Sequence, residues 1–493
     1  MGSKFRANSY IARNSGTVVQ RYRHSYHVMP EIGWCNDPNG FAYYDGKIHL
    51  FYQYNPYSAG WDTMHWGHVT SRDFIKWEYQ PVALAPDMPY DDCGCFSGSA
   101  IEKDGMLYLM YTGVNAEGLQ QQCLAFASDG VSFEKPFVEP VITKENVGPE
   151  MSIQDFRDPY VFRMGGYYYS IMGTKAQDYG NIALYRSKDL INWQFQGYCM
   201  NGTDPKDDNY YRLNAVYECP CFAEVDGKQI LICSPQFLPQ EGCRFQNVHS
   251  VVYMVGRLDL ESGRFHYDKF EEVDSGFDFY AAQTTTMPDG RVVLSAWMQM
   301  WDRNLPSQPD GWAGAMVLPR ELHYKNGRLY QTPVREIENY RLNRVERKDI
   351  ALGGDLVRIE GIAGDTLELI TEFETGNAER VGIKLFEGKE HETLLYYDCK
   401  KGEVVLDRSC SGVPLAGVEE NNATRSVEVP VTDGKITLRV FLDNTSIEAF
   451  VNDGYAVLTA NVYADEEDEG ISFFAAGGTA KLNRVTKYDI VVK

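Results

Sequence analysis

The sequence contains no apolar run long enough to span a bilayer, and no run of lysine or arginine that could follow a phosphate backbone. Acidic residues outnumber basic ones by 69 to 47, which gives a formal net charge of -22 at pH 7. We therefore expect neither a membrane partner nor a nucleic-acid partner. The 493 residues are 44% hydrophobic and 24% charged, as is usual for a folded globular protein.

The N-terminal segment MGSKFRANSYIARNSG lacks the apolar core of a signal peptide, and Arg6 stands where a myristoylation signal requires Ser or Thr. The 11 cysteines are an odd-numbered set scattered along the chain, which is typical of a reducing compartment and not of a disulfide framework. We therefore predict a cytoplasmic protein. The two C-x-C pairs are spaced more closely than most zinc ligands, and we expect no metal and no other cofactor.

Several signature motifs are also missing. The chain contains no H-E-x-x-H, no G-x-x-x-x-G-K-[ST], no G-x-G-x-x-G that opens a helix and no G-x-S-x-G. These absences argue against a zinc peptidase, a nucleotide-binding domain and a serine hydrolase. His65 and His68 in MHWGH would point to opposite faces of a strand, so structural hydrogen bonding is their expected role.

What the sequence does contain is a repeat. A Gly-marked turn followed by an apolar, aromatic-rich run recurs at intervals of 59 to 63 residues: DGKIHLFYQY from Asp45, DGMLYLMYTG from Asp104, GGYYYSIMGT from Gly165, DGKQILICSPQ from Asp226 and DGRVVLSAWMQ from Asp289. Each such turn predicts a β-hairpin. A second repeated motif lies later in three of the units, as SRDFIKW, SDGVSF and SKDLINW. Units of several short strands at this spacing predict a five-bladed β-propeller over roughly residues 25–335.

One polar residue precedes each hairpin by six to eight residues, on the strand that would line the propeller axis. We call these five positions the stations, and they are Asp37, Ser97, Asp158, Glu218 and Gln283. Because the innermost strands surround one channel, we expect the three carboxylates to meet in a single pocket. Any one of these acids alone would be explained more readily as a turn or capping residue. Asp204, which also precedes a proline but lies off the stations, is interpreted as a loop residue.

Carboxylates beside aromatic side chains favour glycoside hydrolysis, in which one carboxylate attacks the sugar and another acid protonates the leaving oxygen. The aromatic residues near the stations are Trp34, Trp61, Trp66, Phe96 and Tyr280. The polar residues able to bind hydroxyl groups are Asn36, Gln53, Ser97, Arg157 and Gln283. We therefore expect a sugar-binding pocket at one end of the channel.

Six segments resemble the signature blocks of glycoside hydrolase family 32, which comprises invertases, sucrose-6-phosphate hydrolases and fructan hydrolases. They are WCNDPNG, FSGSA, FRDP, YECP, GWAGAMVLPREL and LRVFLDNTSIEAFVNDG. The resemblance extends over nearly the whole chain. It implies an all-β fold, with a five-bladed β-propeller followed by a C-terminal β-sandwich, and hydrolysis of terminal β-fructofuranosyl bonds with retention and without a metal.

The resemblance also implies a role for each carboxylate. Asp37 matches the family's nucleophile, Glu218 its general acid/base, and Asp158, accompanied by Arg157, the carboxylate that holds sugar hydroxyls and stabilises the transition state. The further sugar contacts that it implies are Asn36, Gln53, Trp61, Phe96, Ser97 and Trp297. Cys35 departs from the family, which most often has Met there; both side chains are soft and apolar, so we expect a modest effect on the pocket.

The charged segment REIENYRLNRVERKDI separates the last propeller repeat from alternating apolar segments such as KITLRVFLD. We therefore expect an N-terminal lead-in at residues 1–24, a catalytic propeller at residues 25–345 and a β-sandwich at residues 346–493. The expected role of the sandwich is to pack against the propeller.

The expected substrate is a small sugar. GCFSGSA and GFDFYAAQT look more like the intracellular bacterial sucrose and sucrose-6-phosphate hydrolases than the secreted levanases, and short fructo-oligosaccharides are further candidates. The alternative from a different class is a non-catalytic propeller that binds sugars or proteins, in which the three acids serve turns and hydrogen bonds. The sequence does not specify the oligomeric state.

Overall fold

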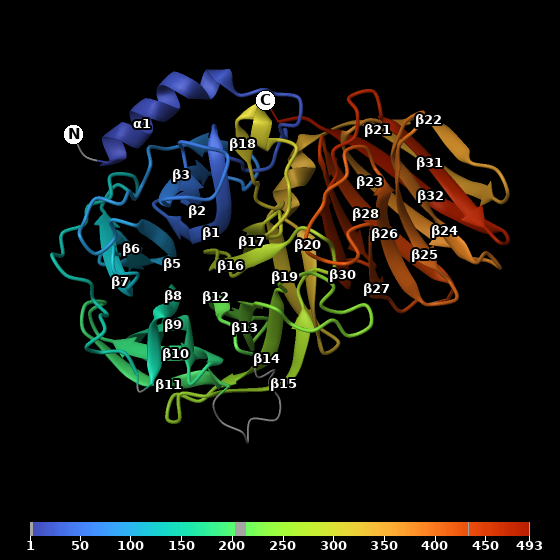
Figure 1. The fold of residues 1–493 in the computed structure, drawn as a ribbon. Coiled ribbons are helices and arrows are strands. Elements are labelled where there is room, and N and C mark those ends of the chain that lie inside the picture. The colour runs from blue at the N-terminus through green and yellow to red at the C-terminus, as the bar shows by residue number, and fades with distance from the viewer. Residues whose placement is uncertain (1–2, 149, 203–212, 432, 493) are drawn as a thin grey trace.

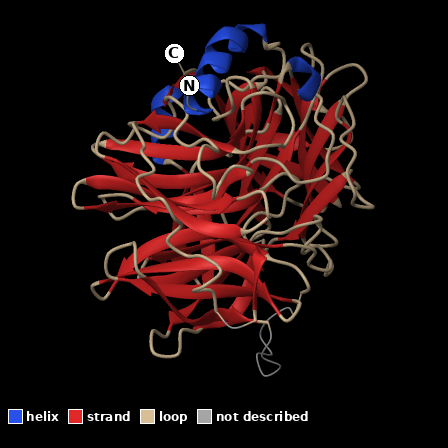
Figure 2. Cartoon of the chain, turned by 60° about the vertical axis from the view of Figure 1, so that its left-hand side comes forward, coloured by secondary structure: helices blue, strands red, loops and turns tan. Residues whose placement is uncertain are grey.

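The computed structural model describes residues 3–148, 150–202, 213–431 and 433–492, so Asp204 lies outside the described residues. Most of the regular structure is β-strand. The helical segments are α1 (Ser3–Asn14) and the 3-10 helices η1 (Ser15–Thr17), η2 (Gln308–Asp310) and η3 (Arg335–Tyr340). Figure 2 shows the helices gathered towards one end of the molecule. Among the described residues, no helix has the length and apolar content needed to cross a bilayer.

The described residues between 33 and 333 form five small sheets. The first contains β1 (Gly33–Tyr44), β2 (Lys47–Asn55), β3 (His65–Ser71), β4 (Trp77–Tyr79) and β18 (Trp312–Ala313). The second contains β5 (Gly94–Lys103), β6 (Met106–Val114) and β7 (Gln120–Ala127), and the third β8 (Met151–Met164), β9 (Tyr167–Ala176), β10 (Tyr179–Ser187) and β11 (Trp193–Asn201). The fourth contains β12 (Tyr217–Val225), β13 (Lys228–Pro235), β14 (Val252–Leu258) and β15 (Phe265–Glu272), and the fifth β16 (Tyr280–Thr286), β17 (Val292–Trp297), β19 (Arg320–Lys325) and β20 (Arg328–Pro333).

The five sheets surround a common centre, with β1, β5, β8, β12 and β16 nearest to it (Figure 1). Each of these innermost strands contacts the next, and β16 contacts β1. The first and last sheets are also joined by β18, which pairs in parallel with β1 through Gly33 with Trp312 and Trp34 with Ala313. Residues from five separate strands can therefore meet at the centre.

The described residues from 341 to 490 form two six-stranded sheets. One has the order β21 (Arg341–Leu352), β32 (Ala480–Ile490), β23 (Thr366–Glu374), β28 (Lys435–Asp443), β29 (Ser446–Val451) and β30 (Ala456–Asn461). The other has the order β22 (Val357–Ala363), β31 (Gly470–Ala476), β24 (Arg380–Glu387), β25 (Glu392–Asp398), β26 (Glu403–Cys410) and β27 (Thr424–Glu428).

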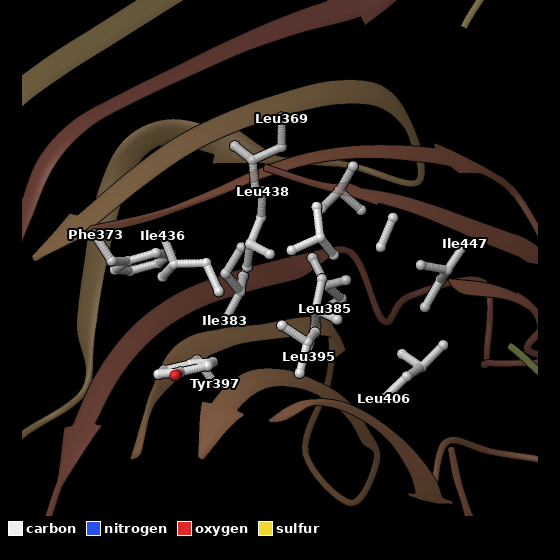
Figure 3. Close-up of a cluster of buried hydrophobic side chains, with 14 of the residues drawn as sticks. Leu369, Phe373, Ile383, Leu385, Leu395, Tyr397, Leu406, Ile436, Leu438 and Ile447 are labelled. Atoms are coloured by element: carbon white, nitrogen blue, oxygen red, sulfur yellow. The ribbon is translucent and has the colours of Figure 1, made fainter. Parts of the chain in front are cut away.

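The two large sheets share one hydrophobic core. Leu369 and Leu438 of one sheet lie above Ile383, Leu385 and Leu395 of the other (Figure 3). In β25 the buried and half-buried residues alternate, as expected for a strand with one face in a core. Burial of this shared apolar surface is the main force that holds the two sheets together.

A buried ionic network joins the small sheets to the large ones. Arg320 Nη1 donates to Asp274 Oδ2 at 2.8 Å, and its Nη2 donates to Glu448 Oε2 at 2.6 Å. His27, ahead of β1, lies 2.7 Å from Asp443 Oδ2 through Nδ1 and 2.9 Å from Glu448 Oε1 through Nε2. All five side chains are buried, so each charge depends on its partners.

Candidate active site

Each innermost strand carries a β-bulge or a similar shift of ladder register. The shifts lie between Cys35 and Pro38 on β1, Phe96 and Gly98 on β5, Arg157 and Tyr160 on β8, Glu218 and Cys221 on β12, and Tyr280 and Gln283 on β16. A bulge leaves residues without a partner in the ladder and redirects their side chains. The same irregularity therefore occurs on all five strands that surround the centre, at the residues the sequence singled out.

Four residues within these bulges form one hydrogen-bonded group. Ser97 Oγ donates to Asp37 Oδ2 at 2.6 Å, and Cys219 Sγ lies 3.5 Å from the same oxygen. The backbone N–H of Cys219 donates to Asp158 Oδ2 at 2.9 Å, and its Sγ lies 3.7 Å from that oxygen. The Cys219 thiol thus contacts the carboxylates of both Asp37 and Asp158.

The residues just before three of the bulges form a second group around Glu218. Arg157 donates to Glu218 Oε1 through Nε at 3.1 Å and through Nη2 at 2.8 Å. The Tyr280 hydroxyl donates to Glu218 Oε2 at 2.6 Å and also lies 3.2 Å from the carbonyl oxygen of Ser234. Both oxygens of Glu218 are therefore held by named donors.

The structure corrects the register expected for Glu218. Counting from the hairpins put Glu218 at the same station as Asp37 and Asp158, but Cys219 is the residue that matches Asp158 within its bulge. Glu218 instead matches Arg157, the last paired residue before the bulge. Gln283 lies at the far end of its bulge and pairs with Ser295. A bulge adds residues to one strand, so distance from the turn does not fix the position along the ladder.

The environment of the acids is short of positive charge. Burial raises the pKa of Asp37, against hydrogen bonds from Ser97 and Asn36 that lower it. Burial also raises the pKa of Asp158; Arg157 opposes this shift, while the charges of Glu218 and Asp37 add to it. Burial and the neighbouring carboxylates raise the pKa of the Cys219 thiol well above its ordinary value, so it stays a protonated donor.

Three of the predicted sugar contacts lie beside these groups. Trp34 Nε1 donates to Asn36 Oδ1 at 2.8 Å, and Asn36 Nδ2 donates to Asp37 Oδ1 at 3.1 Å. Trp61 is 51% exposed, and its ring meets that of Phe96 edge-on with centroids 6.0 Å apart. Phe96 precedes Ser97 in the chain, so these two rings connect the carboxylate group to the surface.

Other expected contacts are buried in the structure. Trp297 is 0% exposed and packs edge-on against Trp34 and Trp301. Gln53 is buried and donates to the carbonyl oxygen of Cys95. Trp66, which the sequence suggested as an aromatic face of the pocket, is wholly buried in a hydrophobic cluster. The sequence pattern could not separate rings that face a pocket from rings that support its wall.

Two participants were missed in the sequence. The sequence pointed to Cys219 only as a member of a C-x-C pair with no expected metal, and to Tyr280 only as an aromatic residue near the catalytic acids. The signal was present in the spacing: Arg157 and Glu218 are 61 residues apart, and Glu218 and Tyr280 are 62 apart, which are the intervals of the repeat.

The mainly β fold and the central carboxylates fit a glycoside hydrolase, and the family models identify the chain as one. Residues 27–333 match the glycosyl hydrolases family 32 N-terminal domain, and residues 336–489 match the glycosyl hydrolases family 32 C-terminal model. The chain therefore belongs to glycosyl hydrolase family 32, which confirms the resemblance seen in its motifs.

Curated relatives and solved structures agree with this assignment. The chain is 37% identical to a raffinose invertase of Escherichia coli over 466 residues, 93% of each chain. It is 35% identical to a sucrose-6-phosphate hydrolase of Zymomonas mobilis over 487 residues, 94% of this chain and 91% of the relative. A Bombyx mori GH32 beta-fructofuranosidase mutant in complex with sucrose superposes with a TM-score of 0.84 at 34% identity, covering 99% of this chain and 98% of that one.

Proposed function

We propose that the protein is a retaining β-fructofuranosidase that hydrolyses the terminal β-D-fructofuranosyl bond of sucrose or sucrose-6-phosphate, and of short fructo-oligosaccharides. The observation that carries this proposal is the set of contacts that links the three acids, which come from three strands. Cys219 contacts both Asp37 and Asp158, and Arg157, the chain neighbour of Asp158, donates to Glu218. The names of the relatives, invertase and sucrose-6-phosphate hydrolase, support the same substrates. Cytoplasmic localisation stays a prediction.

We also propose that the five small sheets are the blades of a β-propeller and that the two large sheets are a β-sandwich. The contacts that run from each innermost strand to the next support this architecture. The proposed divisions are a lead-in at residues 1–24, the propeller at residues 25–345 and the sandwich at residues 346–493, with β21 crossing the last junction.

In the proposed mechanism Asp37 attacks the anomeric carbon while Glu218 protonates the departing oxygen, and water activated by Glu218 then releases fructose. A retaining pair needs its carboxyl groups roughly 5 to 5.5 Å apart. Asp158 would accept hydrogen bonds from the hydroxyl groups of the fructosyl ring. Ser97 and Asn36 hold the two oxygens of Asp37, which fixes its orientation before substrate arrives.

The contacts of Glu218 indicate which of its oxygens carries the catalytic proton. Oε1 already receives two N–H donors from Arg157, so a proton there would meet other protons. Oε2 faces the Tyr280 hydroxyl, which has a second acceptor in the Ser234 carbonyl oxygen. Tyr280 can donate to Oε2 when Glu218 is ionised, and to Ser234 when Oε2 holds the proton.

Some side chains in the walls of the site would touch the sugar, and others would hold those side chains in place. Trp61 and Phe96 present accessible rings and are the proposed stacking faces for sugar. Since Trp297 and Gln53 are buried, we propose that they position Trp34 and the backbone near Cys95 instead of touching the sugar.

Release of reducing sugar from sucrose and sucrose-6-phosphate tests the proposal against the non-catalytic alternative. We expect turnover by the native chain and almost none by Asp37→Asn or Glu218→Gln. Glu224→Gln is the matched control, because Glu224 is an exposed acid on the same strand as Glu218 and lies outside the proposed machinery. A native chain that releases no fructose from either sugar would favour the binding propeller.

A further inference from the structure

The segment at residues 246–250, between β13 and β14, is attached to the large sheets. Gln246 Nε2 donates to the carbonyl oxygen of Ser426 at 2.8 Å, and the backbone N–H of Ser426 donates to Gln246 Oε1 at 3.4 Å. Arg425 Nε donates to Asn247 Oδ1 at 2.9 Å. Because Arg425 and Ser426 belong to β27, this strand holds the start of the segment.

Glu419, which precedes β27, holds the middle of the same segment. Its Oε1 accepts the backbone N–H of Val248 at 3.3 Å and Nη2 of Arg303 at 2.6 Å. The side chain of Glu419 is 7% exposed; burial opposes its charge, but Arg303 outweighs burial and lowers the pKa of Glu419. Arg303 is itself paired with Asp278 at 2.6 Å, so Glu419 is a charged and firmly held acceptor.

The far end of the segment holds the end of β13, beside the proposed acid/base. The backbone N–H of Ser250 donates to the carbonyl oxygen of Pro235 at 3.2 Å. Pro235 follows Ser234, whose carbonyl oxygen lies 3.2 Å from the Tyr280 hydroxyl. The position of this second acceptor for Tyr280 therefore depends on the segment.

His249 connects the segment to Tyr280 through its ring. The two ring centroids are 5.6 Å apart, and His249 is buried. Nδ1 of His249 lies 2.8 Å from the carbonyl oxygen of Val248, which fixes the orientation of the ring. Burial lowers the pKa of His249, so the ring is neutral and adds no charge beside Glu218. Since Tyr280 donates to Glu218 Oε2 at 2.6 Å, this series of contacts ends on the acid/base.

We propose that Glu419 is a positioning residue for the acid/base, and that the large sheets thereby help to set the orientation of Glu218. Glu419 holds the backbone at Val248. The adjoining ring of His249 packs against Tyr280, which donates to Glu218 Oε2. The inference rests on the proposed function and goes beyond it, because it gives the proposed β-sandwich a part in catalysis besides packing.

The test compares Glu419→Ala with the native chain on two substrates, sucrose and a β-fructofuranoside with a nitrophenyl leaving group. The variant leaves the N–H of Val248 without its acceptor, so we expect kcat/KM on sucrose to fall about 10-fold as Glu218 loses its orientation. A nitrophenyl group departs without protonation, so kcat/KM on that substrate should fall less than about 2-fold. A general disturbance of the fold would lower both values alike.

Two further variants serve as controls. Glu419→Gln keeps an oxygen acceptor for Val248 and removes only the charge, so it should lose stability but keep the native ratio of the two kcat/KM values. Glu420→Ala removes the neighbouring exposed acid and should change neither kinetics nor stability.

A milder variant tests the same series of contacts from the other partner. Gln246→Ala removes both hydrogen bonds with Ser426 without removing a charge, and kcat/KM on sucrose should fall about 3-fold with the nitrophenyl substrate again spared. An unchanged ratio of the two kcat/KM values in either variant, Glu419→Ala or Gln246→Ala, once circular dichroism shows it folded, would overturn the inference and leave the proposed function intact. If the native chain hydrolyses neither substrate, it is the proposed function that fails.

Discussion

Two sets of buried acids in this molecule differ in how their charge is balanced. The central set, Asp37, Asp158 and Glu218, faces one guanidinium, that of Arg157. The set between the small and large sheets is Asp274, Asp278, Asp443 and Glu448, and it faces Arg303, Arg320, Arg408 and His27. The central set therefore keeps an excess of negative charge, whereas each acid of the second set contacts at least one basic side chain.

The pKa directions follow this difference for Asp278, Asp443 and Glu448, whereas burial raises the pKa of Asp274 in spite of its contact with Arg320. Burial alone would raise the pKa of Asp443 and Glu448, but contacts with His27 and Arg320 outweigh it and hold both below their ordinary values. For Asp37 and Asp158 burial prevails and the pKa rises. Acids that only join two parts of a fold are neutralised, whereas the central acids keep proton affinity and charge that a reaction can use.

The largest expected effect is loss of catalysis without loss of folding. Asp37→Asn should lower kcat on sucrose about 10,000-fold, because the nucleophile is removed. Its unfolding midpoint in urea should equal or exceed that of the native chain, because one of three close negative charges is gone. A variant that also unfolds would remove the contrast between the two sets of acids.

Breaking the paired set should have the opposite outcome. Arg320→Met leaves Asp274 and Glu448 buried without their cation, and we expect the free energy of unfolding to fall by about 3 to 5 kcal/mol. Lys400→Met, which breaks an exposed pair with Glu379, is the control and should cost less than about 1 kcal/mol. Equal effects of the two variants in urea titrations would contradict this account.

His27 makes the stability contributed by the paired set depend on pH. Burial opposes its charge, yet hydrogen bonds to Asp443 and Glu448 raise the pKa of His27 from 6.5 to about 9. A raised pKa stabilises the fold fully below pH 6.5, and this stabilisation is lost as the pH rises through about 9. The loss should be about 3 kcal/mol in the native chain. His27→Gln should lose this pH dependence, as measured by urea unfolding at several pH values.

The smallest expected effect concerns Tyr280. Tyr280→Phe removes a donor to Glu218 Oε2 while keeping the ring, and kcat should fall about 10-fold. The KM for sucrose should change little, because the lost contact is to Glu218 and not to the sugar. A purely structural role for Tyr280 would lower the free energy of unfolding and leave kcat unchanged.

Local signals in the sequence identified the hairpins correctly. Asp45, Asp104 and Asp226 all have positive φ and precede a glycine with positive φ, the conformation that Asp-Gly turns favour. This preference is set by neighbouring residues alone, so it can be predicted without knowledge of the fold. The mainly β architecture follows from the same signals.

Features that depend on distant residues could not be predicted in the same way. The bulge that begins after Glu218 and contains Cys219 is defined by the pairing of β12 with β13. Trp297 packs against Trp34, which is distant from it in the sequence, and against Trp301. His27 and Asp443 are 416 residues apart, and no local pattern links them. The candidate acids were therefore predictable, but their exact partners were not.

The most direct test of the central claim uses Glu218→Ala and a β-fructofuranoside with a nitrophenyl leaving group, which departs without protonation. Without Glu218 to activate water, the covalent intermediate should accumulate. Intact-mass measurement should show the addition of one fructosyl unit, and peptide mapping should place it on Asp37. No adduct, or an adduct on another residue, would contradict the account.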